Sequence, residues 1–328
     1  MRRTYPTLIS HWHLRTLPGR VKRDFLSLHD LTPGEFEGLL DLAAEVKRHP
    51  EVFRHALDGK VLALVLEKPS LRTRVSFEVG MDQLGGQAVY LGPADVGLGQ
   101  RETVTDVARN LARWVNAVAV RTFGHSIVEE MAREAHIPVI NALSDLLHPS
   151  QAVADMLTLR EHKGSLKGLH LAYLGDGNNV CHALLQAAAK TGMHLVVASP
   201  RGYEPKASVL AEAREDAKVT GAQLLVVEDP GDAVERADAV YTDVWTSMGQ
   251  EAEAPVRRAA FSRYQVNRYR MARAKPNALF LHCLPAHRGE EVTSEVLDGP
   301  RSIVLDQAEN RLHVAKAVLL ALLGEGHV

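Results

Sequence analysis

Short apolar runs alternate with segments of helical periodicity along most of this chain. The first run, Val61–Leu66, is continuously apolar, as is typical of a parallel strand that is covered on both faces. The runs that follow are QAVYL, AVAV, PVIN, LHLAYLG, HLVVA, QLLVV, AVYT and LFLHCL. Because a helical or loop segment follows each run, the pattern predicts an α/β fold of two domains, each a mainly parallel sheet flanked by helices.

Helix start signals and one long helical segment set the expected domain limits. Thr32, Pro33 and Glu35 form a capping-box sequence, and Ser70 stands where an N-cap would precede a helix that repeats Val75, Val79 and Leu84. A helix near residues 150–162 is the natural boundary. We therefore predict a first domain over residues 1–149 with an N-terminal arm, a second over residues 150–306, and a C-terminal helix within residues 307–328 that packs back on the first domain.

Composition narrows the possible partners. The 38 basic and 40 acidic side chains among 328 residues give a net charge of -2, so nothing favours nucleic acid or an acidic membrane. No run is long enough to span a membrane. Two cysteines, Cys181 and Cys283, without a secretory signal predict a reduced, cytoplasmic protein. We predict no metal site, because neither His11 with His13 nor His282 with His287 has a third ligand at suitable spacing.

Polar clusters follow nearly every predicted strand. In parallel sheets ligands bind beyond the carboxyl ends of the strands, so these clusters predict a substrate site in the cleft between the domains. The clusters are Ser70 to Thr73, Arg121 with Thr122, His148 to Gln151, Asp176 to Asn179, Asp243 to Gly249 and His282 to Arg288.

The segment after Val61–Leu66 has the features of an anion site. Ser70 would expose the unpaired N–H groups of a helix start, and Arg72 and Arg74 would add positive charge. An ordinary capped helix with solvent-facing arginines is the alternative.

Four motifs resemble those of one enzyme family. Ser70-Leu71-Arg72-Thr73-Arg74 is similar to the carbamoyl-phosphate motif S-T-R-T-R of the transcarbamoylases, and His148-Pro149-Ser150-Gln151 is similar to their H-P-x-Q motif. Asp243 to Gly249 (DVWTSMG) and His282 to Pro285 (HCLP) resemble the signatures of the members that act on ornithine. The resemblance to the aspartate/ornithine carbamoyltransferase family covers roughly residues 24–324, with motif order and spacing intact.

This resemblance implies transfer of the carbamoyl group of carbamoyl phosphate to the side-chain amine of L-ornithine, which gives citrulline and phosphate in arginine metabolism. No cofactor is implied. Arg121, His148, Cys283 and Arg311 would be the catalytic residues. Carbamoyl phosphate would be bound by Ser70, Leu71, Arg72, Thr73, Arg121, His148, Gln151 and Arg311, and ornithine by Asn179, Asp243, Ser247, Met248, Cys283 and Leu284.

Simpler interpretations exist for single residues. His148 before a proline can be a cap and turn, Arg121 a surface charge, Cys283 a small buried side chain, and Asp243 the cap of a strand-end turn. Leu71 replaces the family's usual threonine, a change that costs little if this position contributes its backbone N–H.

Other functions make different demands on the sequence. A dinucleotide site at LHLAYLGDGNNV would need a third glycine at position 180, where Val180 stands, and an acidic residue after HLVVA, which runs into Ser199 and Pro200. A non-catalytic binding module would not need both substrate motifs. An enzyme that uses aspartate as acceptor would need cationic side chains where Ser247 and Met248 stand. An enzyme that uses putrescine would not need Ser247 and Met248. N-acetylornithine remains a possible acceptor.

The segment Gly97 to Glu102 resembles the loop that a neighbouring subunit contributes to the site in family trimers, which implies a homotrimer or a multiple of it. Gly97 stands where relatives often carry a polar side chain, and Arg101 is the candidate for contact with the neighbour's phosphate.

Overall fold

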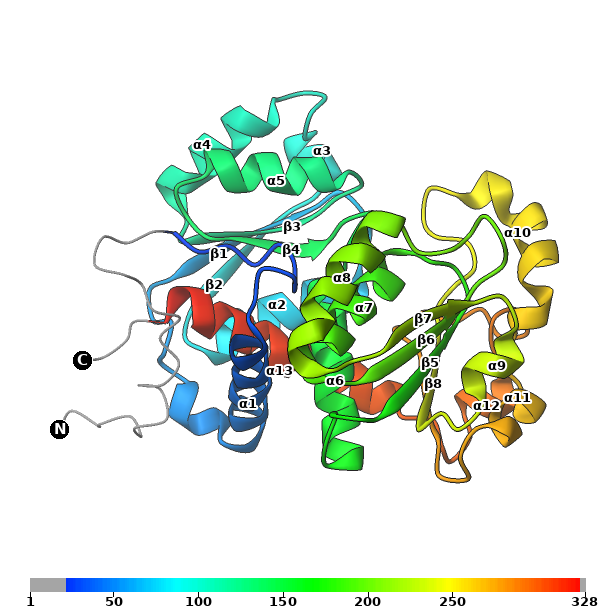
Figure 1. The fold of residues 1–328 in the computed structure, drawn as a ribbon. Coiled ribbons are helices and arrows are strands. Elements are labelled where there is room, and N and C mark those ends of the chain that lie inside the picture. The colour runs from blue at the N-terminus through cyan, green and yellow to red at the C-terminus, as the bar shows by residue number, and fades with distance from the viewer. Residues whose placement is uncertain (1–21, 325–328) are drawn as a thin grey trace. The chain divides into compact units, whose positions relative to one another are not determined.

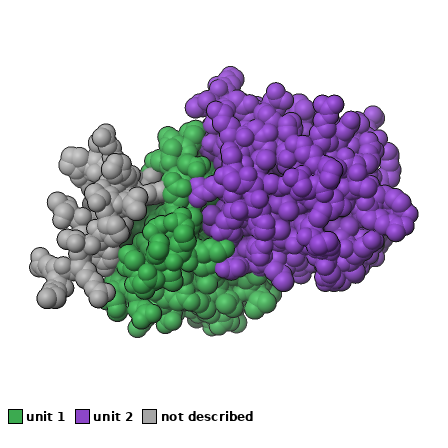
Figure 2. Space-filling model, turned by 90° about the horizontal axis from the view of Figure 1, so that it is seen from below, with its two compact units in different colours: residues 1–153, 311–328 green, residues 154–310 purple. Residues whose placement is uncertain are grey.

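The computed structural model describes residues 22–324, so the predicted N-terminal arm lies outside the described residues. The chain divides into two compact units (Figure 2): unit 1 runs to residue 153 and resumes at residue 311, and unit 2 comprises residues 154–310. Each division lies four residues beyond the predicted boundary, inside helix α6 (Pro149–Lys163) or helix α13 (Val304–Leu323). Both helices therefore pass from one unit into the other without a break.

Unit 1 is built on a parallel sheet with the strand order β2-β1-β3-β4. Helices α4 and α5 cover one face, and α2 and α13 lie on the other (Figure 1). The strands are β1 (Val61–Leu66), β2 (Gln87–Leu91), β3 (Ala117–Arg121) and β4 (Val139–Leu143); the helices are α1 (Pro33–Arg48), η2 (Pro50–Phe53), α2 (Leu71–Gln83), α3 (Pro93–Val96), α4 (Val104–Trp114) and α5 (His125–Glu134).

Helix α2 buries a face of small, polar and apolar residues. Its buried positions are Thr73, Ser76, Phe77, Gly80 and Met81, whereas Val75 is 45% exposed and Leu71 is 74% exposed. A β-carbon at Gly80 would meet Lys316, Leu319 and Leu312 of α13 at 3.5 to 3.9 Å, so α2 packs closely on that helix. The helix predicted from Val75, Val79 and Leu84 is confirmed, and of these three residues Leu84 is buried.

Unit 2 contains a second parallel sheet, in the order β7-β6-β5-β8-β9. The strands are β5 (His170–Leu174), β6 (His194–Ala198), β7 (Leu224–Val227), β8 (Ala239–Thr242) and β9 (Leu279–Leu281). The helices are α7 (Asn179–Thr191), α8 (Ala207–Thr220), α9 (Pro230–Val234), η3 (Glu251–Glu253), α10 (Ala254–Phe261), η4 (Ser262–Tyr264), α11 (Arg268–Arg273) and α12 (Ser294–Leu297). The α/β class and both parallel sheets are confirmed. No helix within residues 22–324 is long and apolar enough to cross a membrane.

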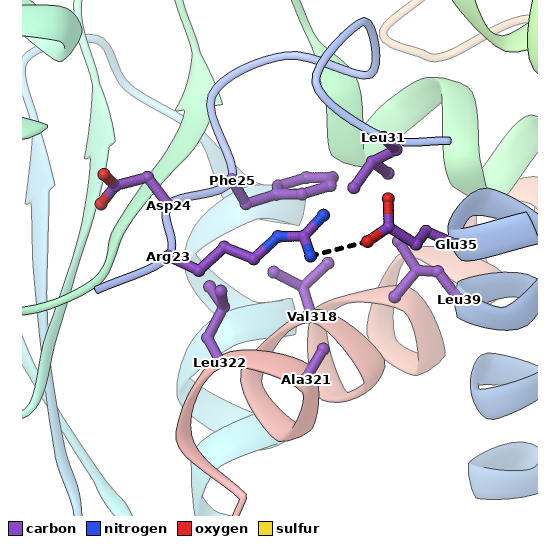
Figure 3. A pocket seen from close by; sticks show the side chains of 9 residues that line it. All are labelled: Arg23, Asp24, Phe25, Leu31, Glu35, Leu39, Val318, Ala321 and Leu322. Atoms are coloured by element: carbon purple, nitrogen blue, oxygen red, sulfur yellow. Dashed lines mark hydrogen bonds and ion pairs between the residues drawn. The ribbon is translucent and has the colours of Figure 1, made fainter. Parts of the chain in front are cut away.

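A small cavity in unit 1 shows how the end of α13 packs against the segment before α1 (Figure 3). Its volume of about 30 Å³ leaves room for only one or two water molecules. Phe25, Val318 and Leu322 are among its apolar walls. Arg23 donates to Glu35 over 2.8 Å and lowers the pKa of that carboxyl to about 2. The cavity is too small to admit a substrate.

Candidate functional site

The start of α2 forms a capped loop directly after β1. Ser70 has extended backbone angles, and its side chain accepts a hydrogen bond from the Thr73 N–H over 3.2 Å. Arg72 is half-buried at this turn. Arg74 instead faces away, with its guanidinium 3.0 Å from Glu78 and over the Tyr90 ring. The candidate anion-binding residues are therefore Ser70 to Thr73, whereas the Arg74 guanidinium is engaged by Glu78 and Tyr90.

Four buried residues from three helices meet near this turn in unit 1. Arg311 Nη1 of α13 lies 3.0 Å from His148 Nε2 and 2.5 Å from Gln151 Oε1, and its Nη2 lies 3.5 Å from Thr73 Oγ1 of α2. All four side chains are at most 6% exposed. The fold thus brings together residues that are up to 238 positions apart in the chain.

His148 is held as a neutral imidazole. Burial lowers its pKa well below the usual value, and the positive charges of Arg311, Arg121 and Arg72 lower the pKa further. Because the Arg311 guanidinium can only donate, His148 Nε2 must accept, which leaves the proton on Nδ1. Nδ1 is buried and has no hydrogen-bond partner among the described residues. The site therefore offers one unused N–H donor beside several guanidinium groups.

Arg121 reaches the same region from the end of β3. Leu66 and Arg121 are paired in the register of β1 and β3, so the residues after both strands emerge at the same edge of the sheet. Behind them, the Thr122 hydroxyl donates to the Glu67 carboxylate, and the Glu67 N–H donates to the Arg121 carbonyl over 2.8 Å. The sequence did not single out Glu67, whose only signal is its place at the end of β1.

Asp243 is the centre of the polar cluster in unit 2. It follows β8 and is 6% exposed. Its carboxylate accepts from Asn178 Nδ2 over 2.8 Å and from the Cys283 thiol over 3.0 Å. Asn178 also caps α7 by accepting from the Val180 and Cys181 N–H groups. The sequence selected Asn179 and missed Asn178, although asparagine directly before a helix is a recognisable cap signal.

The Cys283 and Leu284 backbone is held by a buried histidine. The Leu284 N–H donates to His282 Nδ1 over 2.8 Å, so Nε2 carries the proton and donates to Glu291 Oε1 over 3.2 Å. Leu284 has a positive φ of 58°, which is unfavourable for a side chain of this size. His282 and Glu291 are fully buried and offset this local strain with hydrogen bonds. The sequence missed Glu291.

Ser247 and Met248 lie in the loop after β8. The Ser247 N–H donates to Gln250 Oε1 over 3.3 Å, and the Gly249 N–H donates to the Glu251 carboxylate over 3.0 Å. Met248 is 47% exposed, which leaves its backbone accessible. The conformation of the loop is thus held by hydrogen bonds from its own backbone N–H groups to the side chains that follow.

The Gly-x-Gly turn after β5 is required by the protein's own packing. A β-carbon at Gly177 would lie 2.2 Å from Pro205 N and 2.3 Å from Glu204 C, which are backbone atoms that cannot move aside easily. The Gly177 N–H donates to the Tyr203 carbonyl over 2.8 Å. The glycine is explained without a dinucleotide.

Within residues 22–324, two groups of side chains bring potential metal-ligand atoms within 4.8 Å of one another: Asp243, His282 and Cys283, and His287, Glu290 and Glu291. The expectation that His287 lacks nearby ligands is therefore wrong, because the turn that follows it returns two carboxylates. The same groups are joined by hydrogen bonds and ion pairs, and we assign no metal to either. His11 and His13 lie outside the described residues.

The Gly97 to Arg101 loop lies at the surface of unit 1. Gly97 ends α3 with a positive φ of 58°. Arg101 is exposed, and its guanidinium lies 3.4 Å from the Asp95 carbonyl. Its side chain is accessible for a contact outside the chain.

Comparison with known proteins matches both units. Residues 23–161 match the family model of the aspartate/ornithine carbamoyltransferase carbamoyl-P binding domain, and residues 167–322 match that of the Asp/Orn binding domain. The chain is 55% identical over 303 residues to an ornithine carbamoyltransferase of Anoxybacillus flavithermus, covering 92% of this chain and 96% of the relative.

Two solved structures of ornithine carbamoyltransferases are also similar to this chain. An ornithine carbamoyltransferase from Pyrococcus furiosus is 49% identical with a TM-score of 0.90, covering 94% of this chain and 99% of that one. The enzyme from Thermus thermophilus is 50% identical with a TM-score of 0.83, covering 92% and 99%.

Proposed function

Because the chain belongs to the aspartate/ornithine carbamoyltransferase family, we propose that it transfers the carbamoyl group of carbamoyl phosphate to the side-chain amine of L-ornithine, which yields L-citrulline and phosphate. The observation that carries this proposal is the buried cluster of Thr73, His148, Gln151 and Arg311 beside the capped start of α2. This cluster combines cationic groups with a neutral N–H donor, as an acyl phosphate with a developing oxyanion requires.

Unit 1 would hold carbamoyl phosphate. The phosphate would be bound by Ser70, the Leu71 N–H, Arg72 and Thr73 at the helix start, where unpaired amides and arginine attract an anion. His148 Nδ1–H, Arg121 and Arg311 would donate to the carbamoyl oxygen, on which negative charge grows during attack. Gln151, whose Oε1 lies 2.5 Å from Arg311 Nη1, would bind the carbamoyl NH2.

Unit 2 would hold ornithine. Asp243 would accept from the α-ammonium, and Asn179, Ser247 and the Met248 backbone would complete the binding of the α-amino acid group. Cys283 and the Leu284 carbonyl would contact the side-chain amine, which must lose a proton before it attacks. The Cys283 thiol already donates to Asp243 over 3.0 Å, so a route for hydrogen bonding from the amine to a carboxylate exists.

The reaction would be direct. The nitrogen lone pair of the neutral amine forms a C–N bond to the carbonyl carbon, the C–O bond to phosphate breaks, and the amine loses a proton. No covalent enzyme intermediate is needed, so the residues act by positioning both substrates and stabilising charge. The interdomain cleft that was expected from the sequence stays a prediction.

We also propose a homotrimer or a multiple of it in which Gly97 and Arg101 contribute to a neighbour's site. Two features support an interface in unit 1. Leu71, Val75 and Val89 are exposed apolar side chains on α2 and β2, which are in contact. Among the strands of residues 22–324, β2 is also at the edge of its sheet and pairs with β1 alone. Exposed apolar side chains beside an open sheet edge favour association.

The cellular role that we propose is arginine biosynthesis in the cytoplasm. Cys181 and Cys283 are both reduced thiols, which agrees with a reducing compartment.

The decisive experiment compares four acceptors with carbamoyl phosphate: ornithine, N-acetylornithine, putrescine and aspartate. We expect ureido product with ornithine only. Arg72→Ala should lower kcat/KM by about 100-fold or more, because a half-buried cationic contact with phosphate is lost. Arg109→Ala is the matched control, since Arg109 forms an exposed ion pair with Glu134 and should leave kcat/KM nearly unchanged.

Two other outcomes of the acceptor comparison would contradict part of the proposal. Turnover of a different amine would contradict the assignment of Ser247 and Met248 while preserving the phosphate site. Absence of turnover with any acceptor, together with thermal stabilisation by phosphate, would favour a non-catalytic binding module.

A further inference from the structure

A buried arginine outside the family motifs contacts the amino-acid loop of unit 2. Arg257 of α10 is 6% exposed. Its Nη1 lies 3.0 Å from Asp176 Oδ2 and 3.0 Å from the Trp245 carbonyl, and its Nε lies 2.9 Å from Glu253. Its guanidinium also lies over the Tyr203 ring at 5.0 Å. One side chain therefore joins four separate segments of the unit.

Trp245 is the fixed base of the loop that carries Ser247 and Met248. Its ring is 4% exposed and stacks on Phe261 with centroids 6.0 Å apart. Phe261 and Arg257 are one turn apart on α10, so the same helix holds both the ring and the carbonyl of Trp245. Met248, only three residues later, is 47% exposed. The loop thus changes from buried to accessible immediately after the Arg257 contact.

Asp176, the other partner of Arg257, lies close in the chain to a residue that binds Asp243. Asp176 precedes the turn at Gly177 and Asn178, and Asn178 donates to the Asp243 carboxylate over 2.8 Å. The Tyr173 hydroxyl donates to the Asp176 carbonyl over 2.9 Å, which fixes the backbone of this turn. Arg257 is therefore in contact with Trp245 directly and is connected to Asp243 through the turn of Asp176 and Asn178.

Opposing effects act on the buried Arg257 and Asp176 pair, because burial disfavours both charges whereas Asp176 and Glu253 raise the pKa of Arg257 above its usual value. Burial raises the pKa of Asp176 to about 6 although Arg257 lowers it, and the carboxylates of Asp243 and Glu253 raise it further. A carboxyl whose pKa is raised on folding costs stability when it ionises. The pair has a geometric consequence instead, because it fixes the Trp245 carbonyl relative to the β5 turn.

We propose that Arg257 is a positioning residue that determines affinity for the amino-acid substrate. By holding the Trp245 carbonyl and Asp176 together, it sets the place of Ser247 and Met248 relative to Asp243. This inference rests on the proposed function, because it concerns the binding of ornithine at that site. Arg257 itself contacts no reacting atom.

The test is Arg257→Gln with steady-state kinetics for each substrate. We expect KM for ornithine to rise tenfold or more, KM for carbamoyl phosphate to stay within twofold, and kcat to fall less than KM rises. L-Norvaline, which is ornithine without its terminal amine, should bind more weakly by a similar factor, since the affected contacts involve the α-amino acid group. Arg258→Gln is the matched control: Arg258 is the next residue of α10, and it forms an exposed ion pair with Glu290.

Two further variants decide the matter if Arg257→Gln does not fold. Arg257→Lys keeps the charge but not the planar group, and Asp176→Asn keeps the shape of the carboxylate but not its charge. Both should raise KM for ornithine at least threefold while KM for carbamoyl phosphate stays within twofold. Folded variants with an unchanged KM for ornithine, or with both KM values raised together, would overturn the proposal. Wild-type protein without ornithine turnover would instead refute the proposed function.

Discussion

At the scale of single residues, His148 has the most specific chemical consequence because its two ring nitrogens differ. Nε2 accepts from Arg311 over 3.0 Å, and Nδ1 keeps its proton in a buried position without a partner among the described residues. A neutral imidazole can donate to a developing oxyanion while costing less to bury than an imidazolium would. The surrounding arginines thus create the donor by keeping the ring neutral.

Replacing His148 with alanine removes this donor. We expect kcat to fall by about 100-fold to 1,000-fold, the range for loss of one oxyanion donor, with a smaller change in KM for carbamoyl phosphate. Steady-state kinetics provide the measurement. His162→Ala is the control, because His162 of α6 pairs with Asp306 of α13, outside the cluster, and its loss should leave kcat unchanged.

The protonation state of His148 provides an independent check. Its folded-state pKa lies below the usual value of about 6.5, so the unfolded chain takes up the proton first as the pH falls. The stability due to the neutral ring is complete above about pH 6.5 and is lost progressively below it. NMR of the ring nitrogens should show no titration of His148 near pH 6.5; a midpoint there would contradict the assignment.

At the scale of elements, the start of α2 combines a structural cap with the proposed phosphate site. Ser70→Ala should lower the free energy of unfolding by about 1 kcal/mol through loss of the cap and should also raise KM for carbamoyl phosphate. Thr32→Ala removes the equivalent cap of α1 and should cost about the same stability without changing KM. Denaturant unfolding and kinetics on both variants separate the two effects, and equal KM values would remove Ser70 from the site.

At the scale of the whole molecule, the proposed assembly depends on the exposed face of α2 and β2. Val89→Glu adds a charge at the sheet edge and should dissociate the trimer and reduce activity, because the proposed site needs a neighbour's Arg101. Val219→Glu on α8 is the control, at a residue that is 76% exposed in unit 2. Sedimentation velocity and activity should change together for Val89→Glu only. A fully active wild-type monomer would refute both the trimer and the shared site.

The sequence by itself determined the elements and the identity of most candidate residues. The nine strands within residues 22–324 follow from short, mainly apolar runs, and β1, β3 and β4 are buried along nearly their whole length, as expected for strands covered on both faces. The caps at Thr32 and Ser70 were equally readable, because capping depends on residues only three positions apart. The family motifs supplied His148, Arg311 and Asp243.

Only the tertiary structure decided which side chains meet and which are buried. No local signal connects Asn178, Glu291 or Arg257 to the site. Their hydrogen-bond partners, which are Asp243, His282 and Asp176, lie 9 to 81 positions away in the chain. The face that α2 buries was decided by its packing on α13, because helix periodicity does not state what a helix packs against. Apolar patterning acts over a few residues and so fixes elements, whereas polar networks and burial depend on three-dimensional neighbours that local sequence does not encode.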